Sequence, residues 1–160
     1  MEKFDTYAAG TPGCERIDLQ KNFRSRDEVL SGVNDIFYKI MCRDLGNVVY
    51  DENAALYPGA DYPEAMDPAM FAMEVLVADE SGAEEMERVE LEACMIASRI
   101  HEMRKESQMV TDKESGELRP MEYRDIVILL RSVSGMADTF VKVLLEEGIP
   151  AFTTSRTGYF

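Results

Sequence analysis

The feature that most constrains the fold is an unbroken apolar run within residues 125–130, "DIVILL". Such a run is typical of a β-strand covered on both faces, as in parallel sheets. A helix is predicted next, capped by Ser134, continuing through Glu147 and ended by Gly148, and residues 149–154 form the following strand. Strand, helix and strand in this order predict a right-handed parallel crossover. We therefore expect an α/β fold with a three-layer parallel sheet.

The same alternation is predicted earlier in the chain. Residues 16–19 and 71–78 are strand candidates, and Ser25 with Glu28 fits a capping box that opens a helix extending to about Cys42. The apolar positions of that helix have the three/four spacing of one buried face. They are Val29, Val33, Ile36, Phe37, Ile40 and Met41.

Three further segments complete the expected organisation. A second helix lies within residues 79–106, with glutamates in its first turns and Arg104 and Lys105 in its last, as the helix dipole favours. A small hairpin is expected at about 109–122, around Gly116. Residues 43–68 have no sustained period and are expected to form a long irregular loop. The apolar stripe of the second helix is Met86, Val89, Ala93, Ile96, Ile100 and Met103.

Composition limits the class of protein. The 160 residues, 46% of them hydrophobic, suffice for one core, so one domain, 1–160, is the default. A net charge of −14 disfavours an autonomous DNA-binding domain. The three cysteines, with no CxxC pair, suit a reducing compartment, and no segment resembles a signal peptide or a membrane span. We expect a cytoplasmic protein with no membrane partner.

Several site chemistries are absent from the sequence. None of the ten glycines is followed by lysine, so the chain has no phosphate-binding loop of the G-x-x-x-x-G-K type, and G-x-G-x-x-G is absent too. His101 is the only histidine, which argues against a catalytic triad or a two-histidine metal site. The many carboxylates fall mostly on helix surfaces, and we assign no metal site.

Two arginines follow predicted strands, where ligands of open parallel sheets bind. Arg24 comes shortly after the first strand, within Asn-Phe-Arg-Ser, and Arg131 with Ser132 directly follows the central one. A guanidinium clamps a phosphate with two parallel hydrogen bonds and keeps its charge near neutral pH. The alternative is that each arginine is a surface ion-pair partner and that Phe23 is an ordinary core residue.

Four stretches resemble a known family. They are "IDLQKNFRSRDEVLSGVNDIF" at 17–37, "YPGADYPE" at 57–64, "YRDIVILLRS" at 123–132 and "LLEEGIPAFTTSRTGYF" at 144–160. Together they resemble the AddA-type subunit of bacterial ATP-dependent helicase/nucleases, which is related to UvrD-like superfamily 1 helicases. The resemblance implies that residues 1–160 are a partial domain, a fragment of the second RecA-like motor domain.

The resemblance also implies roles for individual residues. "LQKNFRS" matches helicase motif IV, in which Phe23 lies by the adenine and Arg24 reaches the γ-phosphate as an arginine finger. Arg131 and Ser132 border the track for single-stranded DNA. Many relatives have tyrosine where Phe23 stands, so the ring remains but its hydroxyl is lost.

The resemblance leaves two hypotheses about function. In the first, the chain is part of an ATP-dependent DNA helicase and exonuclease for double-strand break repair and recombination. The parent would use ATP and magnesium and would work with DNA, its own remaining domains and a second, AddB-type subunit. The isolated fragment, lacking the phosphate loop and the nuclease, would bind no cofactor and would not be an enzyme. In the second, the chain is an acidic α/β protein-interaction module with no nucleotide role.

The charge of the chain generates a prediction about DNA. We expect the isolated chain to bind single-stranded DNA weakly or not at all at ~150 mM salt, because a few arginines cannot offset a net charge of −14. Fluorescence anisotropy with a labelled oligonucleotide measures this. Micromolar or tighter binding would contradict it.

Overall fold

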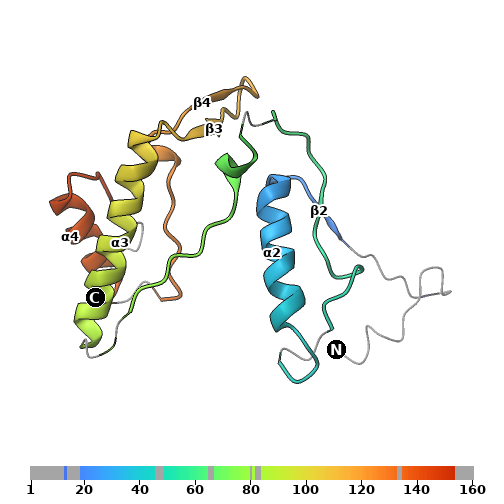
Figure 1. Cartoon of the computed structure of the whole chain (residues 1–160), viewed down its shortest axis with the longest axis horizontal. Coiled ribbons are helices and arrows are strands. Elements are labelled where there is room, and N and C mark those ends of the chain that lie inside the picture. The colour runs from blue at the N-terminus through green and yellow to red at the C-terminus, as the bar shows by residue number, and fades with distance from the viewer. Residues whose placement is uncertain are drawn as a thin grey trace. The chain divides into compact units, whose positions relative to one another are not determined.

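The computed structural model describes residues 13, 19–45, 49–64, 67–79, 81, 84–132 and 135–153. The chain divides into two compact units, 1–73 and 74–160. The first contains β1 (Lys21–Asn22), α2 (Asp27–Ile40), β2 (Tyr57–Pro58) and the 3₁₀ helix η1 (Pro68–Phe71). The second contains α3 (Glu85–Lys105), β3 (Met109–Thr111), β4 (Leu118–Pro120), the 3₁₀ helix η2 (Tyr123–Asp125) and α4 (Ala137–Glu146) (Figure 1).

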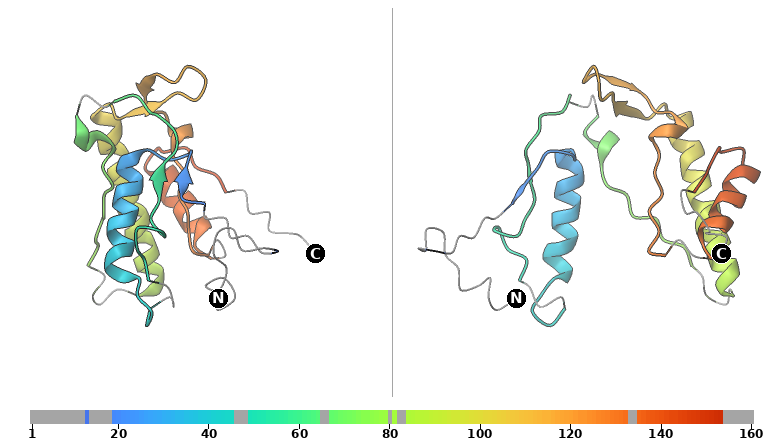
Figure 2. Two further views of the ribbon diagram at one scale, coloured as in Figure 1. Left: turned by 90° about the vertical axis from the view of Figure 1, so that its right-hand side faces the viewer. Right: turned by 180° about the vertical axis from the view of Figure 1, so that it is seen from behind.

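The first unit is built on a parallel pair of short strands joined through a helix. Lys21 pairs with Tyr57 and Asn22 with Pro58, and α2 lies alongside the pair in every view (Figures 1 and 2). The strand predicted at 16–19 falls mostly outside the described residues, and the observed β1 begins two residues after it. Within the expected loop 43–68, β2 supplies a strand that the sequence pattern did not indicate.

Helix α2 begins later than expected. Its N-cap is Arg26, which makes no side-chain capping bond, so the predicted Ser25–Glu28 capping box is wrong. The reason is a turn just before the helix, in which the Asn22 side chain accepts from the Ser25 N–H and moves the helix start beyond Ser25. The helix ends at Ile40, two residues short of the expected Cys42.

The buried side of α2 also differs from the predicted face. Leu30 is 2% exposed, whereas the predicted face members Val29, Phe37 and Ile40 are exposed. The segment that returns to β2 bonds to Asn34, which lies one helical turn beyond Leu30 and one position from Val33 of the predicted stripe. The hydrophobic period located the helix but not the side that this segment covers.

The second unit is held by the packing of α4 on α3 (Figures 1 and 2). Small residues Ala93 and Ala97 let the two helices approach closely. The buried core forms two clusters, which are Ala97, Ile100, Leu144 and Ile149, and Ala93, Phe140 and Val143. Helix α3 begins with the reciprocal capping bonds of Glu84 and Glu87 and ends in Arg104 and Lys105, confirming the expected charge distribution.

The described residues do not complete the expected three-layer sheet. Their ladders are the parallel pair β1–β2 and the antiparallel hairpin β3–β4. Strands were predicted at 71–78, 125–130 and 149–154, and the described residues of these segments form no ladder with another described segment. In the 126–130 segment, alternate residues pack on the helices while Val127 and Leu129 are exposed, so α3 and α4 cover one face only.

The hairpin was predicted correctly, and an arginine ties it to the chain that follows. Arg119 binds Asp125 through both terminal nitrogens, at 2.6 and 2.8 Å, and reaches Asp112 at 3.1 Å. The Arg119 bonds lower the pKa of Asp125 to about 2. Backbone bonds from Ser115, then Arg119, lower the pKa of Asp112 to about 2. Both carboxylates therefore keep their charge until the pH falls towards 2. Their ion pairs with Arg119 persist over the same range.

Both long helices of the second unit end in the same backbone motif. At α4, Gly148 has φ +74° and donates to the Leu145 carbonyl, and the Ile149 N–H donates to Leu144, as predicted for a glycine end. At α3 the equivalent position is Ser107, with φ +55°. An L side chain is strained in this left-handed conformation, so Ser107 destabilises an otherwise complete cap.

We therefore expect Ser107→Gly to raise the unfolding free energy of the second unit by about 0.5–1 kcal/mol, after allowing for the greater freedom of glycine in the unfolded chain. Thermal unfolding measures the change. The control is Ser98→Gly, at an exposed position within α3, where glycine should destabilise by a similar amount. A lower melting temperature for Ser107→Gly would refute the strain.

Candidate functional site

The candidate site is the turn that follows β1. The Asn22 side-chain oxygen accepts hydrogen bonds from the N–H groups of Arg24 (2.8 Å) and Ser25 (2.9 Å). This Asx turn fixes the backbone between strand and helix. It places Phe23 and Arg24 just beyond the carboxyl end of β1, the end at which ligands bind on parallel sheets. Two of the residues predicted as functional are thus neighbours in one ordered turn.

The ring of Phe23 lies against a backbone and is open on its other side. A Cβ on Gly59 would stand 2.8 Å from Cε1 of Phe23, so the ring rests directly on the glycine. Phe23 remains 68% exposed. The alternative that Phe23 is an ordinary core residue is therefore wrong.

Arg24 is exposed, and its main chain is hydrogen-bonded to another segment. The hydroxyl of Tyr62 donates to the Arg24 carbonyl at 2.7 Å. Within the described residues, no hydrogen bond or ion pair engages the guanidinium. The alternative, that Arg24 is a surface ion-pair partner, therefore has no support among the described residues.

Arg26, two residues on, is the anchor of this region and was not predicted. Its guanidinium lies 3.8 Å from the ring centre of Phe71 and 5.3 Å from that of Tyr62, and it donates to the Pro63 carbonyl at 2.7 Å. Its Nε is 3.4 Å from Glu28, and its side chain is 13% exposed. Arg26 thereby ties Tyr62, Pro63 and Phe71 to the start of α2. Of its two rings, only Tyr62 lies in the expected loop 43–68, whereas Phe71 lies in the segment predicted as a strand.

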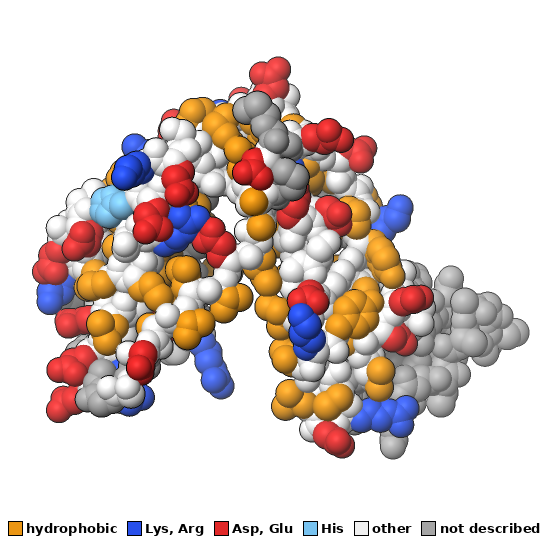
Figure 3. All heavy atoms as spheres, in the orientation of Figure 1, with side chains coloured by type: hydrophobic (Ala, Val, Ile, Leu, Met, Phe, Trp, Pro, Cys, Tyr) orange, Lys and Arg blue, Asp and Glu red, His pale blue; other side chains and the backbone are white. Residues whose placement is uncertain are grey.

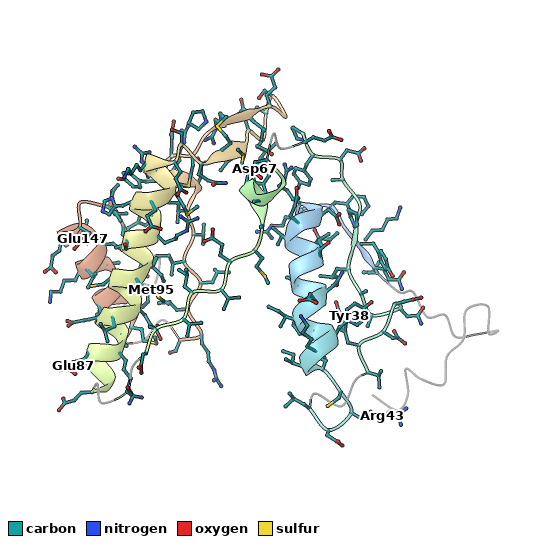
Figure 4. The ribbon with its side chains drawn as sticks, viewed as in Figure 1. Tyr38, Arg43, Asp67, Glu87, Met95 and Glu147 are labelled. Atoms are coloured by element: carbon teal, nitrogen blue, oxygen red, sulfur yellow. The ribbon has the colours of Figure 1, made fainter. Side chains whose placement is uncertain are left out.

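A second polar anchor, Asn34 of α2, holds the return segment next to β1. Its side chain donates to the Leu56 carbonyl (2.9 Å) and accepts from the Leu56 N–H (3.0 Å) and the Tyr50 hydroxyl (2.7 Å). The ring of Tyr50 in turn packs on Phe37 and Tyr38, and Tyr38 is labelled on α2 in Figure 4. These contacts bring β2 into register with β1, and thereby bring Gly59 and Tyr62 to the turn.

The 3₁₀ helix η1 completes the surroundings of Arg26. The side chain of Asp67, labelled in Figure 4, accepts from the Ala69 N–H at 2.9 Å and caps this short helix. Phe71 at its end supplies the ring that lies under the Arg26 guanidinium. The aromatic contact therefore depends on a capped helical turn with its own fixed geometry.

Arg131 and Ser132, the predicted DNA contacts, lie in the second unit. Both are exposed and follow the extended segment 126–130. The Arg131 side chain makes no hydrogen bond or ion pair with another described residue. These residues have the exposure that a contact with a DNA backbone requires.

The described residues hold no cluster of potential metal ligands. No three histidine, cysteine or carboxylate side chains among them come together as a metal site would require. Acidic side chains are scattered over the visible face of each unit, with exposed hydrophobic ones between them (Figure 3). None of the described helices has the length and apolar character needed to cross a membrane.

The strand–helix–strand unit, with an aromatic ring and an arginine exposed beyond its first strand, is an α/β unit with a candidate ligand-binding turn. No family model matches the chain. The AddA subunits of bacterial ATP-dependent helicase/nucleases do match it: that of Lachnoclostridium phytofermentans is 38% identical over 192 residues, covering 100% of this chain. The one from Alkaliphilus oremlandii is 40% identical over 167 residues, again covering 100%, and the one from Bacillus cytotoxicus is 44% identical over 156 residues, covering 94%.

The chain is therefore homologous to a segment of the AddA subunit of ATP-dependent helicase/nucleases. It spans only 14%, 14% and 12% of the lengths of these three relatives. The homology agrees with the family resemblance of the sequence. It does not identify the domain of these subunits to which the segment corresponds.

The Asx turn makes a prediction of its own. Asn22→Ala removes the acceptor for the Arg24 and Ser25 amides, and each bond of this kind contributes about 1 kcal/mol. We expect exchange of these two amide hydrogens, followed by NMR, to accelerate by roughly fivefold. Asn22→Asp keeps the acceptor and is the control. Equal exchange in the alanine variant and the unsubstituted chain would contradict the role of the side chain.

Proposed function

We propose that the chain is part of the second RecA-like motor domain of an ATP-dependent DNA helicase/nuclease that acts in double-strand break repair and recombination. In this proposal Arg24 is an arginine finger. It stabilises the charge that develops on the γ-phosphoryl group of an ATP–magnesium complex, which the phosphate loop of another motor domain holds. Other segments of the parent protein supply the remaining strands of the sheet.

The observation that carries the proposal is the exposed, unengaged guanidinium of Arg24 on an ordered turn. An arginine finger needs a fixed backbone and a side chain that is not already bound to a carboxylate. Asn22 and Tyr62 hold the backbone of the turn. No described acid engages the side chain.

The neighbouring ring supports the same role. Phe23 is exposed on one side and backed by Gly59 on the other, the arrangement that a base-stacking ring requires. Phe23 would lie against the adenine while Arg24 reaches the terminal phosphate. The missing tyrosine hydroxyl leaves stacking as the interaction available to this side chain.

DNA binding and partners belong to the intact parent in this proposal. Exposed Arg131 and Ser132 would contact the backbone of single-stranded DNA, with the basic groove supplied largely by other domains, because this chain is strongly acidic. The parent protein would work in the cytoplasm with a second, AddB-type helicase/nuclease subunit. The competing function is an acidic protein-interaction module without a nucleotide role, which the exposed apolar residues Val127 and Leu129 favour.

The deciding experiment is Arg24→Ala in the intact parent protein. Loss of an arginine finger should lower DNA-stimulated ATP turnover on the order of a thousandfold, or roughly 4 kcal/mol of transition-state stabilisation. ATP affinity should stay within about tenfold, because the phosphate loop supplies most ground-state binding. Arg24→Lys should recover little of the loss, since a point charge does not reproduce the planar, two-pronged donor.

The matched control is Arg43→Ala. Arg43, labelled in Figure 4, is an exposed arginine in the turn beyond the other end of α2. This substitution removes the same charge from the same unit without touching the Asx turn, so turnover should be unchanged. A fully active Arg24→Ala parent would end the arginine-finger assignment and leave the interaction module as the better explanation.

A further inference from the structure

We infer that Gly59 and Tyr62, in the segment that follows β2, are positioning residues for the turn after β1. Gly59 sets the place of the Phe23 ring, and Tyr62 sets the main chain from which the Arg24 side chain extends. Neither residue would touch the nucleotide. The inference rests on the proposed function, which assigns the ring to the base and the guanidinium to the phosphate.

The case for Gly59 is steric. A Cβ at this position would lie 2.8, 2.9 and 3.0 Å from Cε1, Cδ1 and Cζ of Phe23, closer than carbon atoms pack. The φ of Gly59 is outside the left-handed region, so the backbone itself does not call for glycine. What the position requires is the absence of a side chain beneath the ring.

Gly59 is also fixed relative to the turn. Its N–H donates to the carbonyl of Asn22 at 2.8 Å, one step beyond the paired residues of β1 and β2. Gly59, on which the Phe23 ring rests, is therefore hydrogen-bonded directly to Asn22, the residue that forms the Asx turn. A ring placed this way has one face against a backbone of known position and the other face free for a flat ligand.

Alanine at 59 would displace the ring rather than unfold the unit. Phe23 is mostly exposed and can swing away at little cost, whereas Gly59 is held by its backbone bond. The displaced ring no longer presents its face at the same place. The expected consequence is weaker binding of the base with a nearly unchanged stability of the fold.

The case for Tyr62 is a single hydrogen bond with a rigid donor. Its hydroxyl donates to the Arg24 carbonyl at 2.7 Å, across 38 positions in the chain. The ring of Tyr62 lies beside the Arg26 guanidinium, which also binds the carbonyl of the next residue, Pro63. Because the Arg24 side chain has no described partner, its direction is set by the main chain, which Tyr62 holds at the carbonyl and Asn22 at the N–H.

The two residues should therefore affect different kinetic constants. Moving the ring acts on nucleotide binding, so Gly59→Ala in the intact parent protein should raise KM for ATP by about fivefold to tenfold with kcat little changed. Loosening the Arg24 main chain acts on the transition state, so Tyr62→Phe should lower kcat about tenfold with KM little changed. A purely structural role would instead lower the melting temperature.

Each substitution has a control within the chain. For Gly59→Ala it is the double variant with Phe23→Ala: if the methyl group acts through the ring, it adds no further increase in KM once the ring is gone. For Tyr62→Phe it is Tyr57→Phe, which removes a similar hydroxyl bond, to the Glu52 carbonyl at 2.9 Å, without touching the turn. Tyr57→Phe should leave both constants unchanged.

The outcomes separate this inference from the proposed function. If Phe23→Ala raises KM but Gly59→Ala does not, or if the methyl group still raises KM in the absence of the ring, the role of Gly59 is refuted and the function stands. If Tyr62→Phe behaves like Tyr57→Phe, the role of Tyr62 is refuted. If neither Phe23→Ala nor Arg24→Ala changes the kinetics, the proposed function and this inference fall together.

Discussion

The first unit depends on the side chain of Asn34. Two strands of two residues each are too short to pair stably in water, so something outside the ladder must hold them in register. Asn34 does so by bonding both the N–H and the carbonyl of Leu56, the residue before β2. A side-chain amide on α2 thus satisfies the backbone of the return segment, as a neighbouring strand would.

From that constraint the geometry of the turn follows. With Leu56 fixed, Tyr57 and Pro58 pair with β1, and Gly59 reaches the Asn22 carbonyl and the Phe23 ring. A few residues later Tyr62 meets the Arg24 carbonyl, and Arg26 closes the segment through Pro63 and Phe71. The candidate site is therefore a property of two chain segments about 35 residues apart rather than of the motif alone.

The sequence predicted the elements whose signals are local. The sequence located helix α3 with its charged ends, the hairpin about Gly116 and the glycine end of α4. The signals for these elements are the hydrophobic period, the helix dipole and the positive φ of glycine, and each depends only on residues close in sequence. It did not predict β2, the anchors Asn34 and Arg26, or the contact of Gly59 with Phe23. Their hydrogen-bond partners within 43–68 lie 16 to 37 positions away, and those residues show no period that points to them. The strands predicted at 71–78 and 125–130 are mostly extended chain without a ladder, because pairing needs a neighbouring strand that the local pattern does not reveal.

Arg24 and Arg26 have the same side chain but different surroundings, which make Arg26 a structural anchor and leave Arg24 as the candidate arginine finger. Both belong to the same five-residue run and carry the same charge. The Asx turn and the late start of α2 direct Arg26 onto two aromatic rings and within 3.4 Å of Glu28. Arg24, in contrast, is exposed and forms no ion pair with a described residue, in a chain whose net charge is −14. In a chain with so many acids, a cation stays available for a phosphate only if the fold leaves it unpaired, and in this turn the carboxylate of Glu28 lies next to Arg26.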